Sequence, residues 1–174
     1  FGPIPRRDVK TRSLQQEPKQ TEERRLTVER NVPMDAIYMV FHKCDRLHPD
    51  YYVHDMMSDL LGNGNSSRFI RNLVQKKQLF SQIDAYIAGS IEPGTFHING
   101  RPSPGVSLEE AEAAIWKELE AMKTEAILEE ELEKVKNRYE SEQIFGNINY
   151  LNVATNLAFF ELIGKAEDIN DEVK

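Results

Sequence analysis

The chain has 174 residues, a formal net charge of −7 and a single cysteine. This length is enough for one domain with its own hydrophobic core. The lone Cys44 excludes an internal disulfide. No apolar run approaches the roughly 18 residues that a transmembrane helix needs, so we expect no membrane span in this sequence. These features leave both the cytoplasm and the periplasm open as the compartment.

The negative charge is concentrated in one part of the sequence. Residues 109–142 carry five basic and twelve acidic residues, whereas residues 31–108 carry seven of each. No basic patch balances this acidic excess. Because proteins that bind nucleic acids generally present a basic face to the phosphate backbone, we expect no nucleic-acid partner.

The beginning of the sequence looks like the interior of a longer chain. Residue 1 is Phe, and no signal-peptide pattern follows it. Residues 3–23 hold three prolines and few apolar side chains, so they bury too little to offset their ordering entropy. We expect residues 1–23 to be a linker from a preceding domain. Residues 24–174 are then a domain that we expect to be truncated at its C-terminus.

Alternation of apolar and polar residues predicts four strands. Residues 24–32 and 35–43 are the first two, separated by a break at Pro33. Residues 81–90 form the third, with one apolar and one polar face, and residues 95–99 return after a turn as the fourth. The last two strands predict a β-hairpin.

Helical spacing predicts five helices. An apolar stripe from Val53 to Leu61 indicates a helix that starts after Pro49 and ends at the Gly62–Asn65 turn. A short helix follows, capped by Ser66 or Ser67. Three more helices are predicted from residue 107, near 129–143 and over 148–163, the first of them opened by a capping box at Ser107.

The predicted order of elements is therefore β-β-α-α-β-β-α-α-α. Hairpin connections favour antiparallel pairing, and the run of helices favours one helical layer. We expect an α+β fold, a two-layer sandwich with a mainly antiparallel sheet and its helices on one face.

Three groups of residues could in principle form a metal site, a nucleophile or a phosphate-binding loop. Five residues that could bind a metal lie within 13 positions, but their spacing is irregular, which favours a solvated loop over a metal site; they are His42, Cys44, Asp45, His48 and His54. No motif fixes a base beside Cys44, which argues against a nucleophile. The Gly62–Ser67 run lacks the lysine of a phosphate-binding loop, which favours a turn between helices over a phosphate cradle.

The segment from Asp50 to Ala85 resembles the insulinase/pitrilysin family of zinc metallopeptidases, which includes mitochondrial processing peptidase. In that family a helix beginning Asp-x-Tyr leads through Leu-Gly-Gly and Ser-Arg-Leu to Leu-Arg-Glu-Lys-x-Gly-Leu-x-Tyr. The matching positions are Asp50 and Tyr52, Leu61-Gly62, Ser67-Arg68-Phe69, and Leu73 to Ser81. Two later stretches are also similar to family motifs, namely Gly94-Thr95-Phe96 and Glu130 to Lys136.

The resemblance implies the processing-peptidase-like fold and a role in a peptidase. Family members pair two similar α+β domains around a closed chamber, with zinc on one domain in an inverted H-x-x-E-H motif. That motif is absent from this sequence. The chain therefore resembles the zinc-free, inactive domain, with no catalytic or metal-binding residue of its own. Zinc is expected in a partner domain, either in the same chain or in a partner subunit of a homo- or heterodimer, with an unfolded peptide as substrate.

Two positions are the candidates for facing substrate. In many members the zinc-free domain supplies an Arg and a Tyr that hydrogen-bond the substrate, and these positions fall on Val74 and Ser81 here. The glycine of the same motif falls on Gln78. Because both substrate-facing residues are replaced, a scaffold or assembly subunit without proteolysis stays open as an alternative. Because each family motif matches only loosely, an unrelated α+β binding module stays open as well.

Overall fold

The structure is a computed structural model that describes residues 3, 5, 17–89 and 91–170. The chain divides into two compact units, residues 1–31 and 32–174. Most of the predicted linker at residues 1–23, and the last four residues of the predicted domain, lie outside the described residues. No helix in the described ranges is long and apolar enough to cross a membrane.

The strand predicted over residues 24–32 is wrong. These residues form no regular element, and the apolar side chains that suggested a strand are exposed, with Leu26 at 88% and Val28 at 56%. An alternating pattern becomes a strand only where a neighbouring strand satisfies its backbone. The pattern alone therefore carried no information about pairing.

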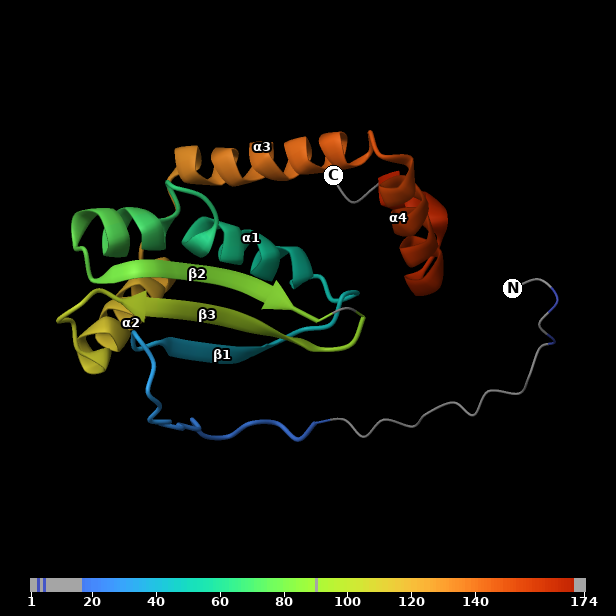
Figure 1. The fold of residues 1–174 in the computed structure, drawn as a ribbon. Coiled ribbons are helices and arrows are strands. Elements are labelled where there is room, and N and C mark those ends of the chain that lie inside the picture. The colour runs from blue at the N-terminus through green and yellow to red at the C-terminus, as the bar shows by residue number, and fades with distance from the viewer. Residues whose placement is uncertain (1–2, 4, 6–16, 90, 171–174) are drawn as a thin grey trace. The chain divides into compact units, whose positions relative to one another are not determined.

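The second unit contains a three-stranded antiparallel sheet (Figure 1). Strands β1 (Ile37–Lys43), β2 (Phe80–Ala88) and β3 (Gly94–Pro102) are arranged in the order β1-β3-β2. The predicted hairpin is confirmed, because β2 pairs with β3 in antiparallel register. The first strand, β1, pairs with the other side of β3 and not with its sequence neighbour β2.

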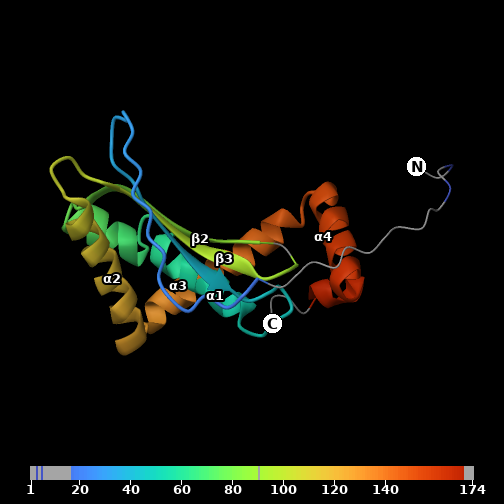
Figure 2. The ribbon, with the colours of Figure 1, turned by 90° about the horizontal axis from the view of Figure 1, so that it is seen from below.

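The helices follow the predicted order closely. They are α1 (Tyr51–Gly62), η1 (Ile70–Lys76), α2 (Leu108–Thr124), α3 (Glu129–Gly146), α4 (Tyr150–Ile163) and the short 3-10 helix η2 (Ala166–Asn170). The start of α2 at Ser107 is confirmed, since the Ser107 hydroxyl caps the helix by accepting a hydrogen bond from the Glu110 amide at 3.1 Å, which is one of the two bonds of a capping box. Figure 2 shows α1, α2 and α3 on one side of the sheet, so the expected α+β sandwich with one helical layer is confirmed.

The core lies between the sheet and these helices. Alternate residues of each strand point into it, and Ile83, Phe96 and Ile98 are almost completely buried. From the helical side the core receives Leu61 of α1 and several residues of α2 and η1. None of the helices in the described residues covers the opposite face of the sheet, which leaves large side chains in solvent, among them Tyr38, Val40 and Tyr86.

The short helix after α1 has an unexpected form. Residues Ile70–Lys76 form a π-helix, which is wider than the predicted α-helix. Its last turn closes with the Lys77 amide bonded to the Asn72 carbonyl at 3.1 Å. π-helical turns are rare and recur at functional sites. Val74, one of the two positions expected to face substrate, lies on this helix, and Ser81, the other, lies at the start of β2.

Candidate functional site

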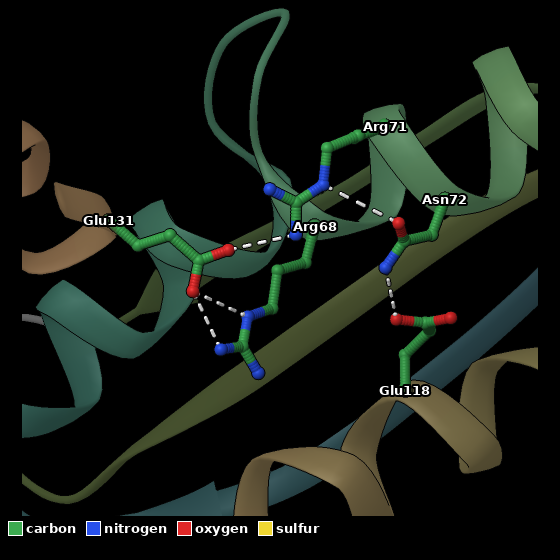
Figure 3. A network of polar contacts seen from close by, with 5 residues as sticks. All are labelled: Arg68, Arg71, Asn72, Glu118 and Glu131. Carbon is green, nitrogen blue, oxygen red and sulfur yellow. Dashed lines mark hydrogen bonds and ion pairs between the residues drawn. The ribbon is translucent and has the colours of Figure 1, made fainter. Parts of the chain in front are cut away.

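A buried carboxylate organises the segment that holds the candidate positions. Glu131, in the first turn of α3, accepts hydrogen bonds from Arg68 at 2.7 and 3.2 Å and from Arg71 at 2.9 Å (Figure 3). Only 13% of the Glu131 side chain and 8% of the Arg68 side chain is exposed. Partial burial raises the pKa of Glu131, but hydrogen bonds and charges from Arg68 and Arg71 outweigh it and lower that pKa below its usual value.

A second carboxylate holds the other side of η1. Glu118 of α2 accepts a hydrogen bond from the Asn72 side chain at 2.7 Å and forms an ion pair with Lys77 at 3.2 Å. Figure 3 shows that Asn72 also contacts Arg71, which joins the two halves into one network. The π-helix is therefore attached to α3 through Glu131 and to α2 through Glu118.

The two candidate residues have different surroundings. Val74 lies on η1, is half-buried and packs against the hydrophobic core. Ser81 is exposed at the start of β2, next to an irregularity in the pairing of β2 with β3, and its hydroxyl donates to the Arg101 carbonyl at 3.1 Å. Their role in contacting substrate stays a prediction.

The linker between these two residues contains a strained backbone position. Gln78 has a φ of 55°, in the left-handed region that favours glycine. Gln78 is the position at which the insulinase/pitrilysin motif has glycine. The position that matches the family's glycine therefore has, in this chain, a backbone conformation that favours glycine.

The residues that were weighed as metal ligands do not converge. Cys44 Sγ lies 3.5 Å from Nδ1 of His54, and that nitrogen also lies 2.8 Å from the Asp50 carbonyl oxygen. His42 is exposed on the helix-free face of β1. Across the residues described, no group of three or more His, Cys, Asp or Glu side chains is placed to hold a metal ion. The described residues therefore do not fit a zinc site.

The helix-free face of the sheet carries an ordered set of polar and aromatic groups. The rings of Tyr86 and His97 are stacked with centroids 4.9 Å apart. Asp84 accepts a hydrogen bond from the Asn99 side chain at 3.2 Å, beside a shallow hollow of about 130 Å³ that Tyr38 also lines. This face therefore offers both apolar contact area and hydrogen-bonding groups to a partner.

The comparisons identify the family. No curated protein sequence matches the chain. The sequence profile described as "Peptidase M16 inactive domain" matches residues 1–139. The chain belongs to the peptidase M16 inactive-domain family. It is thus a non-catalytic domain of the family that the sequence motifs indicated.

Three solved structures are similar to this M16 inactive domain. A protease from Helicobacter pylori is 25% identical, with a TM-score of 0.73 over 80% of this chain and 34% of that chain. The inactive peptidase domain of a proposed zinc protease from Bordetella parapertussis is 20% identical, with a TM-score of 0.71 over 85% of this chain and 80% of that chain. A peptidase M16 inactive domain from Pseudomonas fluorescens is 17% identical, with a TM-score of 0.55 over 78% of this chain and 36% of that chain.

These matches confirm the fold, and this chain spans about a third of the length of the Helicobacter protein. The buried network was missed at the level of sequence. Arg68 and Glu131 each belong to a motif that resembles the family, but neither motif indicates that the two side chains meet. Glu118 has no signal that separates it from the other acids of α2, since only the fold shows which of them is buried.

Proposed function

We propose that this domain forms one wall of the substrate chamber of an M16 zinc metallopeptidase. The zinc and its activated water belong to a partner domain, in the same chain or in a partner subunit. This domain supplies the opposite surface, which helps to hold an unfolded peptide. Membership of the inactive-domain family supports the proposal, as does the lack of a metal-ligand group among the residues described.

The observation that carries the proposal is the helix-free face of the sheet. Tyr38 is 71% exposed and Val40 is 53% exposed on this face, while the other face is covered by the helical layer. Large apolar side chains gathered on one surface mark an interaction site, and the polar hollow beside Tyr38 adds hydrogen-bonding groups. An unfolded peptide presents the same mixture of apolar side chains and backbone polar groups.

A photo-crosslinking experiment tests this role. The chain is combined with its zinc-bearing partner domain and an unfolded peptide, with the change Tyr38→p-benzoylphenylalanine on the sheet face. The matched control carries the same residue at Lys136, which is exposed on α3. We expect the peptide to crosslink at position 38 and not at position 136. Equal crosslinking at both positions would contradict the chamber-wall role.

The second candidate function is a scaffold subunit of a complex without proteolysis. It is favoured by the surroundings of the two positions where the family has Arg and Tyr. Val74 packs against the core, and the Ser81 hydroxyl is bonded to a backbone carbonyl. An H-x-x-E-H motif in the parent chain or in a partner subunit distinguishes the two functions, because only the peptidase needs it.

A further inference from the structure

The helix-free face of the sheet presents two full charges of opposite sign. Side chains that alternate with the buried ones point outward along β1, β2 and β3. Among the described outward residues of these strands, Asp84 is the one carboxylate and Arg101 is the one arginine or lysine. Both residues line the hollow of about 130 Å³ beside Tyr38. A partner seated in this hollow therefore meets a carboxylate and a guanidinium.

The side chain of Arg101 is available to a partner. Arg101 is exposed near the end of β3, and within the described residues its guanidinium has no hydrogen-bond or ion-pair partner. Its backbone carbonyl accepts the Ser81 hydroxyl at 3.1 Å, which joins the hollow to the start of β2. The guanidinium therefore offers several donors and a positive charge to an anionic group.

The carboxylate of Asp84 is held in place and still has capacity for a second donor. Asp84 is half-buried, and its Oδ1 accepts a hydrogen bond from the Asn99 side chain at 3.2 Å. Its Oδ2 has no partner among the described residues. An ionised carboxylate accepts more than one hydrogen bond, so a cationic side chain that enters the hollow can pair with Asp84.

The register of the strands sets the spacing between the two charges. Gln82 lies opposite Arg101, and Asp84 lies opposite Asn99, so Asp84 and Arg101 are diagonal neighbours. Diagonal neighbours in an antiparallel pair lie about 7–8 Å apart. In an extended peptide, residues i and i+2 point to the same side and lie about 7 Å apart. The two charges therefore have the spacing of alternate side chains in an extended peptide.

We propose that this hollow selects extended peptides that carry a basic and an acidic residue two positions apart. The basic side chain pairs with Asp84 and the acidic side chain pairs with Arg101. The inference rests on the proposed chamber-wall function and names the substrate that this wall prefers. Two like charges at this spacing would give one repulsive contact, and charges three positions apart would point to opposite sides of the peptide.

Competition crosslinking in the complex with the zinc-bearing partner domain tests this preference. The probe is Val40→p-benzoylphenylalanine, at an exposed position of the same face that does not line the hollow. Unlabelled peptides compete with a labelled unfolded peptide for crosslinking, and a chelator prevents their cleavage. The competitors contain Lys-x-Glu or Glu-x-Lys, and the spacing controls, with the same composition, contain Lys-x-x-Glu or Glu-x-x-Lys.

We expect a peptide with the two-residue spacing to compete about tenfold better than its spacing control, which is roughly threefold for each exposed ion pair. The advantage should fall as the salt concentration rises, because salt screens exposed charges. Equal competition by the matched and the spacing-control peptides would overturn the inference, while crosslinking at position 40 would still support the chamber-wall function. No crosslinking at position 40 would overturn both.

Change of either charge should switch the preference. With Arg101→Glu we expect peptides with Lys-x-Lys to compete best, and with Asp84→Lys we expect peptides with Glu-x-Glu to do so. Lys136→Glu, an exposed change on α3, alters the net charge as much as Arg101→Glu and is the matched control. It is expected to keep the preference of the original chain. The same preference in Arg101→Glu and Lys136→Glu would contradict the pairing of Arg101 with an acidic residue.

Discussion

Oε2 of Glu131 lies 2.7 Å from Nη2 of Arg68, a residue 63 positions earlier in the chain. The two residues come from separate motifs that resemble the M16 family, Ser67-Arg68-Phe69 and Glu130-Glu131-Leu132. Their contact attaches the start of α3 to the chain just before η1, the helix that carries Val74. Two motifs that lie far apart in the sequence are thus joined in the fold by one buried ion pair.

Loss of this carboxylate charge should destabilise the domain strongly. Glu131→Gln leaves Arg68 buried without an anionic partner, and we expect the free energy of unfolding to fall by about 3 kcal/mol. Glu133→Gln, an exposed change on the same helix, is expected to alter it by less than about 0.5 kcal/mol. Urea unfolding of both variants at neutral pH measures the difference. Similar losses in both would show that the network does not stabilise the fold.

Gly62 should tolerate no side chain, because α1 packs there directly on the backbone of β2. A Cβ on Gly62 would overlap the backbone nitrogen of Ala85. We expect Gly62→Ala to lower the free energy of unfolding by about 1–3 kcal/mol through overpacking. At Gly146, the last residue of α3, an added Cβ meets nothing within 4 Å. Gly146→Ala is therefore the matched control, expected to raise helix stability slightly in the same thermal melts.

The comparison of sequence with structure separates local from non-local information. The helices α1 and α2 were predicted well because an apolar stripe and a capping residue depend only on residues that are close together in the sequence. The strand predicted over residues 24–32 was wrong because strand formation depends on a partner that the segment does not specify. Gly62 shows the same dependence on non-local contacts. The sequence indicates only that Gly62 ends a helix, because its close contact with β2 exists only in the fold.

The candidate site was predictable only as a region. The motif positions located the segment from Leu73 to Ser81, but not that η1 is a π-helix or that Val74 faces the core. Nor does the spacing of acids along α2 and α3 reveal which of them are buried. Glu118 and Glu131 become distinct from their neighbours only in the fold, where Glu118 contacts Asn72 and Glu131 contacts Arg71.

The backbone at Gln78 should be relieved by glycine. A left-handed conformation costs a residue with a side chain about 1–2 kcal/mol, while glycine adds entropy to the unfolded chain. We expect Gln78→Gly to raise the free energy of unfolding by about 0.5 kcal/mol, and Gln78→Ala to give no such gain. Denaturant midpoints of the two variants measure this. A gain from alanine equal to that from glycine would contradict a backbone origin.

Asp55 of α1 should make the domain less stable as the pH rises, whereas a salt-bridged acid makes a protein more stable as the pH rises. Burial raises the pKa of Asp55 above its usual 3.8, and Asp59 and Glu142 add to the rise, although Arg46 and Lys43 oppose it. The protonated form therefore favours folding. This stabilisation is complete below pH 3.8 and is lost as the pH rises through the raised native pKa.

Asp55→Asn should therefore stabilise the domain at neutral pH. The amide carries no charge that burial would penalise, so the free energy of unfolding is expected to exceed that of the original chain at pH 7. The advantage should shrink as the pH falls toward 3.8. Asp35→Asn, at an exposed position, is the control. An advantage of Asp55→Asn that stays constant across this pH range would contradict the titration of Asp55 as its cause.

Restoring the family residues at the candidate positions tests whether they face substrate, and this prediction rests on the proposed function. Ser81 is exposed, so Ser81→Tyr should fold normally in a zinc-bearing complex. One hydrogen bond made only in the transition state is worth about 1.5–3 kcal/mol, or about tenfold to a hundredfold in turnover. Ser81→Phe fills the same space without the hydroxyl and is expected to give no such gain.

The double variant Val74→Arg with Ser81→Tyr should lose thermal stability while it gains turnover. Val74 packs against the core, so an arginine there must turn outward, and we expect the melting temperature to fall relative to Ser81→Tyr alone. Turnover measured beside a melting curve separates the two effects. Equal turnover of the original complex, Ser81→Tyr and the folded double variant would show that neither position contacts substrate. That result would leave the chamber-wall role to the helix-free face around Tyr38 and Tyr86.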